Sequence, residues 1–285
     1  MRKTLILAVV ALWANMTGFG QGLVPTTQDI NSFFHTKTMV VLQDNPLMEY
    51  NQIIKDVMKQ EWKVTEYDFI SYKQFEEMRN NPQYSFLYMS SVTFEKDKTD
   101  AQYRFLFLSL GGDYARMNQM PDLASVPLAY YDVEEDNYTY KLAILVRFIQ
   151  NHVRLIQEHP EIVSSNVLQY YNDNIKDMKG KTLYLLEDEL AKEVNSTARI
   201  KKVYPYKFKI VTKDEIAQAI KNRDESVVFL HKVGPEGTKI NARCYKIIIG
   251  AADAKFYYFD YHKISDKKPD GFLADDFKAL AKKMK

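Results

Sequence analysis

The stretch KTMVVL at residues 37–42 returns as KTLYLL at residues 181–186, and this repeat predicts how the chain folds. At the same offset of 144 residues, the segment 62–64 corresponds to 206–208. Apolar segments farther along keep the same order at offsets of 141 and 128 residues. Because self-similarity at a long period is the signature of a repeated structural unit, we predict two similar lobes produced by an internal duplication.

Each copy has the pattern of an α/β lobe with a mixed sheet. A short apolar run at residues 38–43 predicts a buried strand, and an amphipathic helix follows it. Alternation over residues 62–67 predicts a second strand, and another helix, a meander of three strands and a long helix at 138–158 follow. The expected order in each lobe is therefore β-α-β-α-β-β-β-α. In the second copy the first helix is expected at residues 190–202.

The repeat and the composition divide the chain into five segments. We expect a signal peptide at residues 1–20, an extended N-terminal arm at 21–36, a first α/β lobe at 37–159, a packed connector at 160–180 and a second α/β lobe at 181–285. The connector contains apolar residues such as Leu168 and Ile175, so it is too apolar for a flexible linker. We expect it to pack as a helix across the junction between the lobes.

The first twenty residues have the pattern of a secretory signal peptide. Arg2 and Lys3 precede an apolar run at residues 5–13 that is too short to span a bilayer, and small residues follow before Gln21. A buried first helix is the alternative. Neither a lipoprotein-type cysteine nor a later apolar stretch long enough for a membrane span occurs in the sequence. We therefore expect a periplasmic or secreted chain.

Charge is distributed unevenly, although the formal net charge is only +2. Residues 21–179 carry 15 Lys and Arg against 22 Asp and Glu, a net charge of −7, whereas residues 180–285 carry 22 against 15, a net charge of +7. This asymmetry favours attraction between the halves or to charged partners, and two ordinary solvated surfaces are the alternative. No polybasic tail or stripe of stacking aromatics occurs, so nucleic-acid binding is not expected.

Patterns for catalysis and metal binding are absent from the sequence. The single cysteine, Cys244, lies in an apolar run and is expected to pack as a small hydrophobic residue. His152 and His159 would lie about 10 Å apart along a helix, too far to share a metal ion. There is no nucleophile elbow, zinc-protease motif or glycine-rich phosphate loop. We therefore expect no enzymatic activity, no cofactor and no metal.

Two pairs of polar residues follow the first strand of each copy. Asp44 and Asn45 follow the strand in the first copy, and Glu187 and Asp188 occupy the matching place in the second. Ligands of open α/β sheets tend to bind at the carboxyl ends of the strands, so these four residues are candidate ligand-binding residues. Capping of the following helices would also explain them.

Tyrosines on the expected meander strands are candidates for a protein interface. One face of each meander should pack on helices, and the other face could be exposed. The alternative is that these side chains fill a core on both faces of the sheet. The candidates are Tyr130, Tyr131, Tyr257, Tyr258 and Tyr261.

The segments 62–88 and 206–230 carry a likeness to known envelope domains, in topology and pattern. Each half resembles the N-terminal domain of TolB and the lipoprotein activators of peptidoglycan synthases. The block from 179–184 to 257–260 is similar to an uncharacterised exported protein family of Bacteroidota. The resemblance implies protein–protein work in the periplasm. The chain departs from the synthase activators because it lacks their lipid-anchored cysteine.

The sequence therefore favours an exported, soluble envelope protein that acts by protein binding or assembly, with a protein partner in the cell envelope and without catalysis. The alternative is a periplasmic protein that binds a small ligand in the cleft between its lobes. A deep pocket with converging polar groups between the lobes would favour the ligand. A flat, exposed aromatic patch would favour the protein partner.

Overall fold

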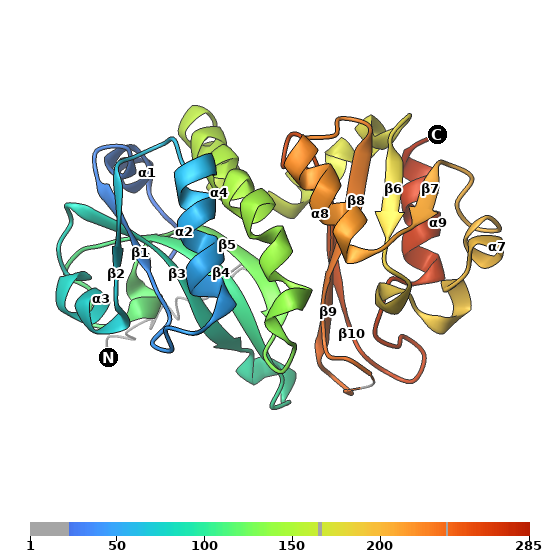
Figure 1. The fold of residues 1–285 in the computed structure, drawn as a ribbon, viewed down its shortest axis with the longest axis horizontal. Helices are drawn as coiled ribbons and strands as arrows, with labels where there is room; N and C mark the ends of the chain where they lie inside the picture. Colours follow the sequence, from blue (N-terminus) through green and yellow to red (C-terminus); the bar gives the residue numbers. More distant parts are fainter. Residues whose placement is uncertain (1–22, 165–166, 238) are drawn as a thin grey trace, which may run out of the picture.

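The computed structural model of the chain describes residues 23–164, 167–237 and 239–285, which form two five-stranded sheets flanked by helices. The two lobes lie side by side, each built around its own sheet (Figure 1). The expected signal peptide at residues 1–20 lies outside the described residues. No helix in the described part of the chain has the length and apolar character of a membrane span.

The first predicted strand lies inside the first sheet, next to the edge strand. Its strands are β1 (Lys37–Val41), β2 (Tyr67–Ile70), β3 (Tyr84–Thr93), β4 (Gln102–Leu110) and β5 (Asp122–Tyr130). Their order across the sheet is β2-β1-β3-β4-β5, and β1 runs parallel to both of its neighbours. β4 and β5 continue the sheet as antiparallel strands, so the sheet is mixed.

The second sheet repeats this arrangement strand for strand. Its strands are β6 (Thr182–Leu185), β7 (Phe208–Ile210), β8 (Val227–Val233), β9 (Arg243–Gly250) and β10 (Phe256–Lys263). The order is β7-β6-β8-β9-β10, with β6 parallel to both neighbours and β9 and β10 antiparallel. Both lobes therefore have the mixed α/β fold predicted from the repeat. Common descent of the two lobes by duplication stays a prediction.

Helices of the first lobe pack on the sheet and on one another. The α-helices are α1 (Thr27–Phe33), α2 (Glu49–Glu61), α3 (Tyr72–Met78) and α4 (Leu142–Glu158). Short 3-10 helices lie in the loops: η1 (Glu95–Asp97) between β3 and β4, η2 (Met117–Gln119) between β4 and β5, and η3 (Glu135–Asn137) and η4 (Thr139–Lys141) between β5 and α4. α2 packs against α4, and α4 lies on the side of the lobe that faces the second lobe (Figure 1).

Two expectations for the first lobe are wrong. The N-terminal arm is not extended throughout, because α1 forms within it. A capping box starts this helix: the Thr26 hydroxyl accepts from the Asp29 amide, and the Asp29 carboxylate accepts from the Thr26 amide. Ile30 and Phe33 of α1 are buried. The strand expected at residues 62–67 begins only at Tyr67, because α2 extends to Glu61 and Trp62 caps it.

The helix expected at residues 190–202 is also wrong. That part of the chain contains η6 (Glu187–Glu189), η7 (Lys192–Val194) and α7 (Thr197–Ile200). The reason is a long-range contact: the Ala191 amide donates to the Phe272 carbonyl and the Phe272 amide donates to the Glu189 carbonyl. This bridge holds Leu190 in an extended conformation, with φ −99° and ψ 140°, which a helical residue does not adopt. The neighbouring Gly271 has a φ of +115°, and a Cβ there would lie 2.7 Å from the Ala191 nitrogen.

The connector covers an edge of the second sheet. It consists of α5 (Glu161–Ser164), α6 (Val167–Asn172) and η5 (Asp173–Met178). The Asn172 side chain accepts from the Phe259 amide at 2.8 Å and donates to the Phe259 carbonyl at 2.9 Å, as a neighbouring strand would. It thereby satisfies backbone groups on β10, which is the outermost strand.

The two lobes share one hydrophobic core. On the second sheet, Phe229, Ile247 and Ile249 are buried in the core cluster that also contains the inner residues of the first lobe. The opposite face of the second sheet, with Val228 and Leu230, belongs to a second core cluster, which α9 (Ala274–Lys283) covers. The helix α8 (Lys213–Asn222) packs on the first cluster. The contact between the lobes is therefore a buried apolar layer, and it fixes the geometry of any cavity between them.

Candidate functional site: a charged cavity between the lobes

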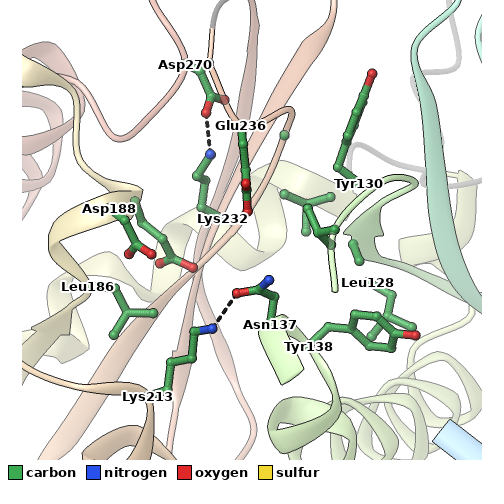
Figure 2. A pocket seen from close by; sticks show the side chains of 16 residues that line it. Leu128, Tyr130, Asn137, Tyr138, Leu186, Asp188, Lys213, Lys232, Glu236 and Asp270 are labelled. Carbon is green, nitrogen blue, oxygen red and sulfur yellow. Dashed lines mark hydrogen bonds and ion pairs between the residues drawn. The ribbon is translucent and has the colours of Figure 1, made fainter. Parts of the chain in front are cut away.

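A cavity of about 310 Å³ lies where the end of β5 faces the end of β8. Both lobes contribute to its walls, and Figure 2 shows the acidic and basic side chains on one side and Leu128 and Tyr138 on the other. The lining residues are Leu128, Ala129, Tyr130, Val133, Asn137, Tyr138, Leu186, Asp188, Glu189, Lys213, Lys232, Val233, Gly234, Glu236, Gly237 and Asp270.

The first lobe supplies a mostly apolar wall. β5 brings Leu128 and Tyr130 to the cavity because alternate strand residues point to the same face. The chain then turns through η3 and η4, which place Val133 and the buried ring of Tyr138 beside them. The Asn137 amide is the polar group that this wall adds.

The second lobe supplies a charged wall. Lys232 lies at the end of β8, and its ammonium group forms an ion pair with the carboxylate of Asp270, which precedes α9 (Figure 2). Burial lowers the pKa of Lys232, but the Asp270 carboxylate outweighs burial and leaves that pKa above its usual value. Gly234 lets Asp270 come close, because a Cβ on Gly234 would lie 2.5 Å from Asp270 Oδ1.

A second ion pair crosses from one lobe to the other. Lys141 Nζ, just before α4, lies 3.2 Å from Glu189 Oε1 in η6, and both side chains are buried. Burial raises the pKa of the Glu189 carboxyl, and the charges of Lys141 and Lys232 act against that rise. For Lys141, burial lowers the pKa but Glu189 raises it above the usual range. A buried pair of this kind depends on both partners being present.

Two further contacts between the lobes frame the cavity. At its mouth, Lys213 Nζ lies 2.5 Å from Asn137 Oδ1 and 2.9 Å from Asp136 Oδ2. Deeper in the interface, His231 Nε2 donates to the Pro127 carbonyl oxygen at 2.8 Å. Burial and the nearby charge of Lys141 lower the pKa of His231 to about 3, so its ring is neutral at physiological pH.

Two carboxylate oxygens of cavity-lining residues have no hydrogen-bond partner among the described residues. Glu189 Oε2 and Asp270 Oδ1 are buried, and neither makes a hydrogen bond to any described residue. The other oxygen of each carboxylate is the one held by a lysine. Most buried polar groups in proteins are hydrogen-bonded, so each exception needs an explanation. Glu189 and Asp270 both line the cavity through other atoms, whereas these two oxygens are enclosed by the protein and do not border its open space.

Of the four candidate ligand-binding residues, the structure brings one to this cavity. Asp188 lines it, and Glu187 borders a shallower depression next to it. Asp44 and Asn45 are exposed and lie outside the described lining of the cavity. The Asn45 side chain instead accepts from the Leu47 amide at 3.0 Å, so it closes a turn. It does not cap the following helix, because the N-cap of α2 is Met48, which makes no side-chain cap hydrogen bond.

The tyrosines expected at an interface are divided between core and surface. Tyr130, Tyr257 and Tyr258 are buried, with exposed fractions of 6%, 3% and 5%, so these three fit the two-sided core alternative. Tyr131 is exposed at 44%, and Tyr261 is half-buried. Of the five, Tyr130 lines the cavity between the lobes.

Sequence reasoning missed the residues that carry most of the charge in the cavity. Lys232 offered a signal, because it stands inside the apolar strand VVFLHKV, where a charged side chain must find a buried partner. Lys141 offered a weaker signal, because it is a single charged residue at the end of η4, directly before the apolar helix α4. Nothing near Glu189 or Asp270 distinguishes them in sequence from solvated acids.

No group of three or more His, Cys, Asp and Glu side chains within the described ranges could hold a metal ion. Comparisons of the chain with protein-family models, curated proteins and solved structures found no match. The resemblance to envelope domains of the TolB type and to an exported family of Bacteroidota therefore stays a prediction.

Proposed function

We propose that this chain is a binding protein that holds a small ligand in the cavity between its lobes. The observation that carries the proposal is a single cavity with a mostly apolar wall from the first lobe and a charged wall from the second, on which Glu189 and Lys232 are held in ion pairs. Ligand sites combine an apolar wall with a few convergent polar groups, and this cavity has both.

The size of the cavity limits the ligand. Sites for drug-sized molecules span about 300–1,000 Å³, and a cavity of about 310 Å³ is at the lower end of that range. The lobes are joined by a shared core of buried apolar residues rather than by a hinge. Because such a core is closely packed, we expect the site to be preformed. We therefore propose a metabolite-sized ligand that enters a largely fixed site.

The proposed role is binding without catalysis, in the periplasm or outside the cell. Export rests on the pattern of residues 1–20, and the absence of catalysis rests on the missing sequence motifs. Protein binding in the cell envelope stays a prediction, and it has less support because three of the five tyrosines chosen for it are buried. The fold alone favours neither role.

A variant that fills the cavity tests the proposal. Val133 is half-buried in the cavity wall, so Val133→Trp should occupy ligand space. Val203, half-buried against the other core cluster, provides the matched control Val203→Trp. A thermal-shift screen of small metabolites should find compounds that raise the Tm of the unaltered protein and of the control but not of Val133→Trp. Equal shifts in all three proteins would contradict binding in the cavity.

A further inference from the structure

Each sheet has an edge strand whose outer side is open. Among the strands of the described residues, β2 pairs only with β1, and β7 pairs only with β6. The Glu66 carbonyl, at the start of β2, accepts from Thr38 of β1, and the Lys207 carbonyl, at the start of β7, accepts from Leu183 of β6. Because alternate residues of such a strand bond to the neighbouring strand, the residues between them direct their backbone donors and acceptors outward. Outward groups of this kind can pair with a strand of another chain.

The open edge of the first lobe is acidic. Glu66, directly before β2, and Asp68, within it, are exposed, and their side chains share one face of the sheet because they are two residues apart. Glu66 makes no ion pair with a described residue, and Asp68 makes one with Lys37 of β1 at 3.3 Å. Tyr67 and Phe69 lie on the other face, half-buried, with ring centroids 5.7 Å apart.

The open edge of the second lobe is basic. Lys207, directly before β7, and Lys209, within it, are exposed and likewise share one face. Lys207 forms no ion pair within the described ranges, and Lys209 Nζ lies 2.5 Å from Glu215 Oε1 in a pair that is itself exposed. Phe208 and Ile210 lie on the other face and are half-buried. The edge of β7 therefore repeats the pattern of β2 with the opposite charge.

The two edges lie toward opposite ends of the molecule. Figure 1 shows β2 near one end of the long axis and β7 near the other. They cannot meet within one chain, but the β2 edge of one copy can approach the β7 edge of another. Two copies of the same edge would bring like charges opposite each other, whereas β2 against β7 places acids opposite lysines. The net charges of −7 and +7 on the two halves of the chain favour the same approach.

We propose that this chain assembles with copies of itself, head to tail, by adding the edge strand β2 of one molecule to the edge strand β7 of the next. Main-chain hydrogen bonds join the strands, acids face lysines on one side, and the half-buried apolar side chains meet on the other. This contact does not close on itself, so it adds copies in a row. The strands contain only four and three residues, so the contact is small and the association is weak. The assembly does not involve the cavity between the lobes and goes beyond the proposed function.

Sedimentation velocity of the purified protein tests this assembly. In about 50 mM NaCl the weight-average sedimentation coefficient should rise as the protein concentration increases from about 10 μM to about 1 mM, and about 500 mM NaCl should suppress most of the rise. The basic-edge variant, Lys207→Glu with Lys209→Glu, should weaken self-association about tenfold or more, because like charges then face each other. The acidic-edge variant, Glu66→Lys with Asp68→Lys, should weaken it as much for the same reason.

An equimolar mixture of the two edge variants should recover the association that each variant loses alone. In the mixture the changed β7 of one variant meets the changed β2 of the other with the charges exchanged, and the remaining two edges are unaltered. The matched control, Lys221→Glu with Lys267→Glu, reverses two exposed lysines elsewhere in the second lobe and should associate like the unaltered protein. The edge variants lose only exposed ion pairs, which contribute little to stability, so they should fold, and circular dichroism checks this.

Four results would contradict the head-to-tail contact. A monomer at every concentration in about 50 mM NaCl would overturn it and leave both edges to partners other than a second copy. Association that salt does not weaken would overturn it without any variant. Equal association of the edge variants and the control would also overturn it, as would a mixture that stays monomeric while both variants are folded. None of these results bears on the cavity, because Val133→Trp tests the proposed function separately.

Discussion

Phe148 of α4 and Phe256 of β10 stack face to face across the two lobes, with ring centroids 3.5 Å apart and ring planes 2° from parallel. Beside them, Arg147 donates to the carbonyls of Ala251 and Ile220 in the second lobe. These contacts join a helix of the first lobe to the edge strand β10, to α8 and to the loop after β9 in the second lobe. The lobes are thus fused through α4, which explains how a cavity between them can keep a fixed shape.

Removing the stacked ring should destabilise the whole molecule. Phe148→Ala leaves a cavity in the shared core, so the free energy of unfolding should fall by about 3–5 kcal/mol. Urea unfolding followed by circular dichroism and by tryptophan fluorescence should still give one transition with coincident midpoints, because the lobes share a core. Tyr170→Ala, which truncates an exposed ring, is the control and should cost far less. Two separated transitions in the unaltered protein would show that the lobes fold independently.

The ion pair between the lobes should depend on both partners. Lys141→Met leaves the Glu189 carboxyl buried without its cation and should cost about 3–5 kcal/mol of unfolding free energy at neutral pH. The double variant Lys141→Met with Glu189→Leu removes both charges and should be more stable than Lys141→Met alone. Chemical denaturation of four proteins measures this: the unaltered protein, Lys141→Met, Glu189→Leu and the double variant. A double variant whose loss equals the sum of the single losses would argue that the two groups do not interact.

Acid should weaken the fold through His231. Burial lowers its pKa to about 3 from 6.5, so the unfolded chain binds a proton below pH 6.5 that the folded chain does not bind until about pH 3. Above pH 6.5 His231 is neutral in both states and does not affect stability. On acidification from pH 6.5 to about pH 3, protonation of this histidine in the unfolded chain lowers the free energy of unfolding by about 1.4 kcal/mol per pH unit. Stability of His231→Gln should decline less steeply on acidification than that of the unaltered protein. Exposed His35→Gln should decline in parallel with the unaltered protein, and the same slope in all three would refute the assignment.

The order of strands and helices along the chain was predictable because it depends on a repeat that sequence can show. Apolar runs at 37–42 and 181–186 form the inner strands β1 and β6, whereas the parallel pairing of these strands with both neighbours had no signal in the sequence. Local signals were less reliable where distant contacts intervened: the bridge between Leu190 and Phe272 prevents the expected helix. α1 had a readable signal in its capping box, Thr26 and Asp29, which lies within an otherwise polar segment.

The cavity was predictable only in outline. A cleft between lobes followed from the two-lobe architecture, and Asp188 followed from its place after a central strand. The Lys141–Glu189 pair joins residues 48 positions apart on different lobes, and a single sequence carries no sign of such a pairing. For Tyr257 and Tyr258 the alternation left an open face and a two-sided core as alternatives, and the structure buries both residues, with the Tyr258 hydroxyl donating to the buried Asp276 carboxylate of α9.

Native mass spectrometry of the protein purified gently from its own cells tests the central claim most directly. The account predicts that the unaltered protein and Val203→Trp carry a small bound molecule, that this molecule is released on unfolding, and that Val133→Trp carries none, because the indole takes its place in the cavity. An identical bound mass in Val133→Trp, or no bound molecule in any of the three proteins together with an empty metabolite screen, would contradict a ligand site between the lobes.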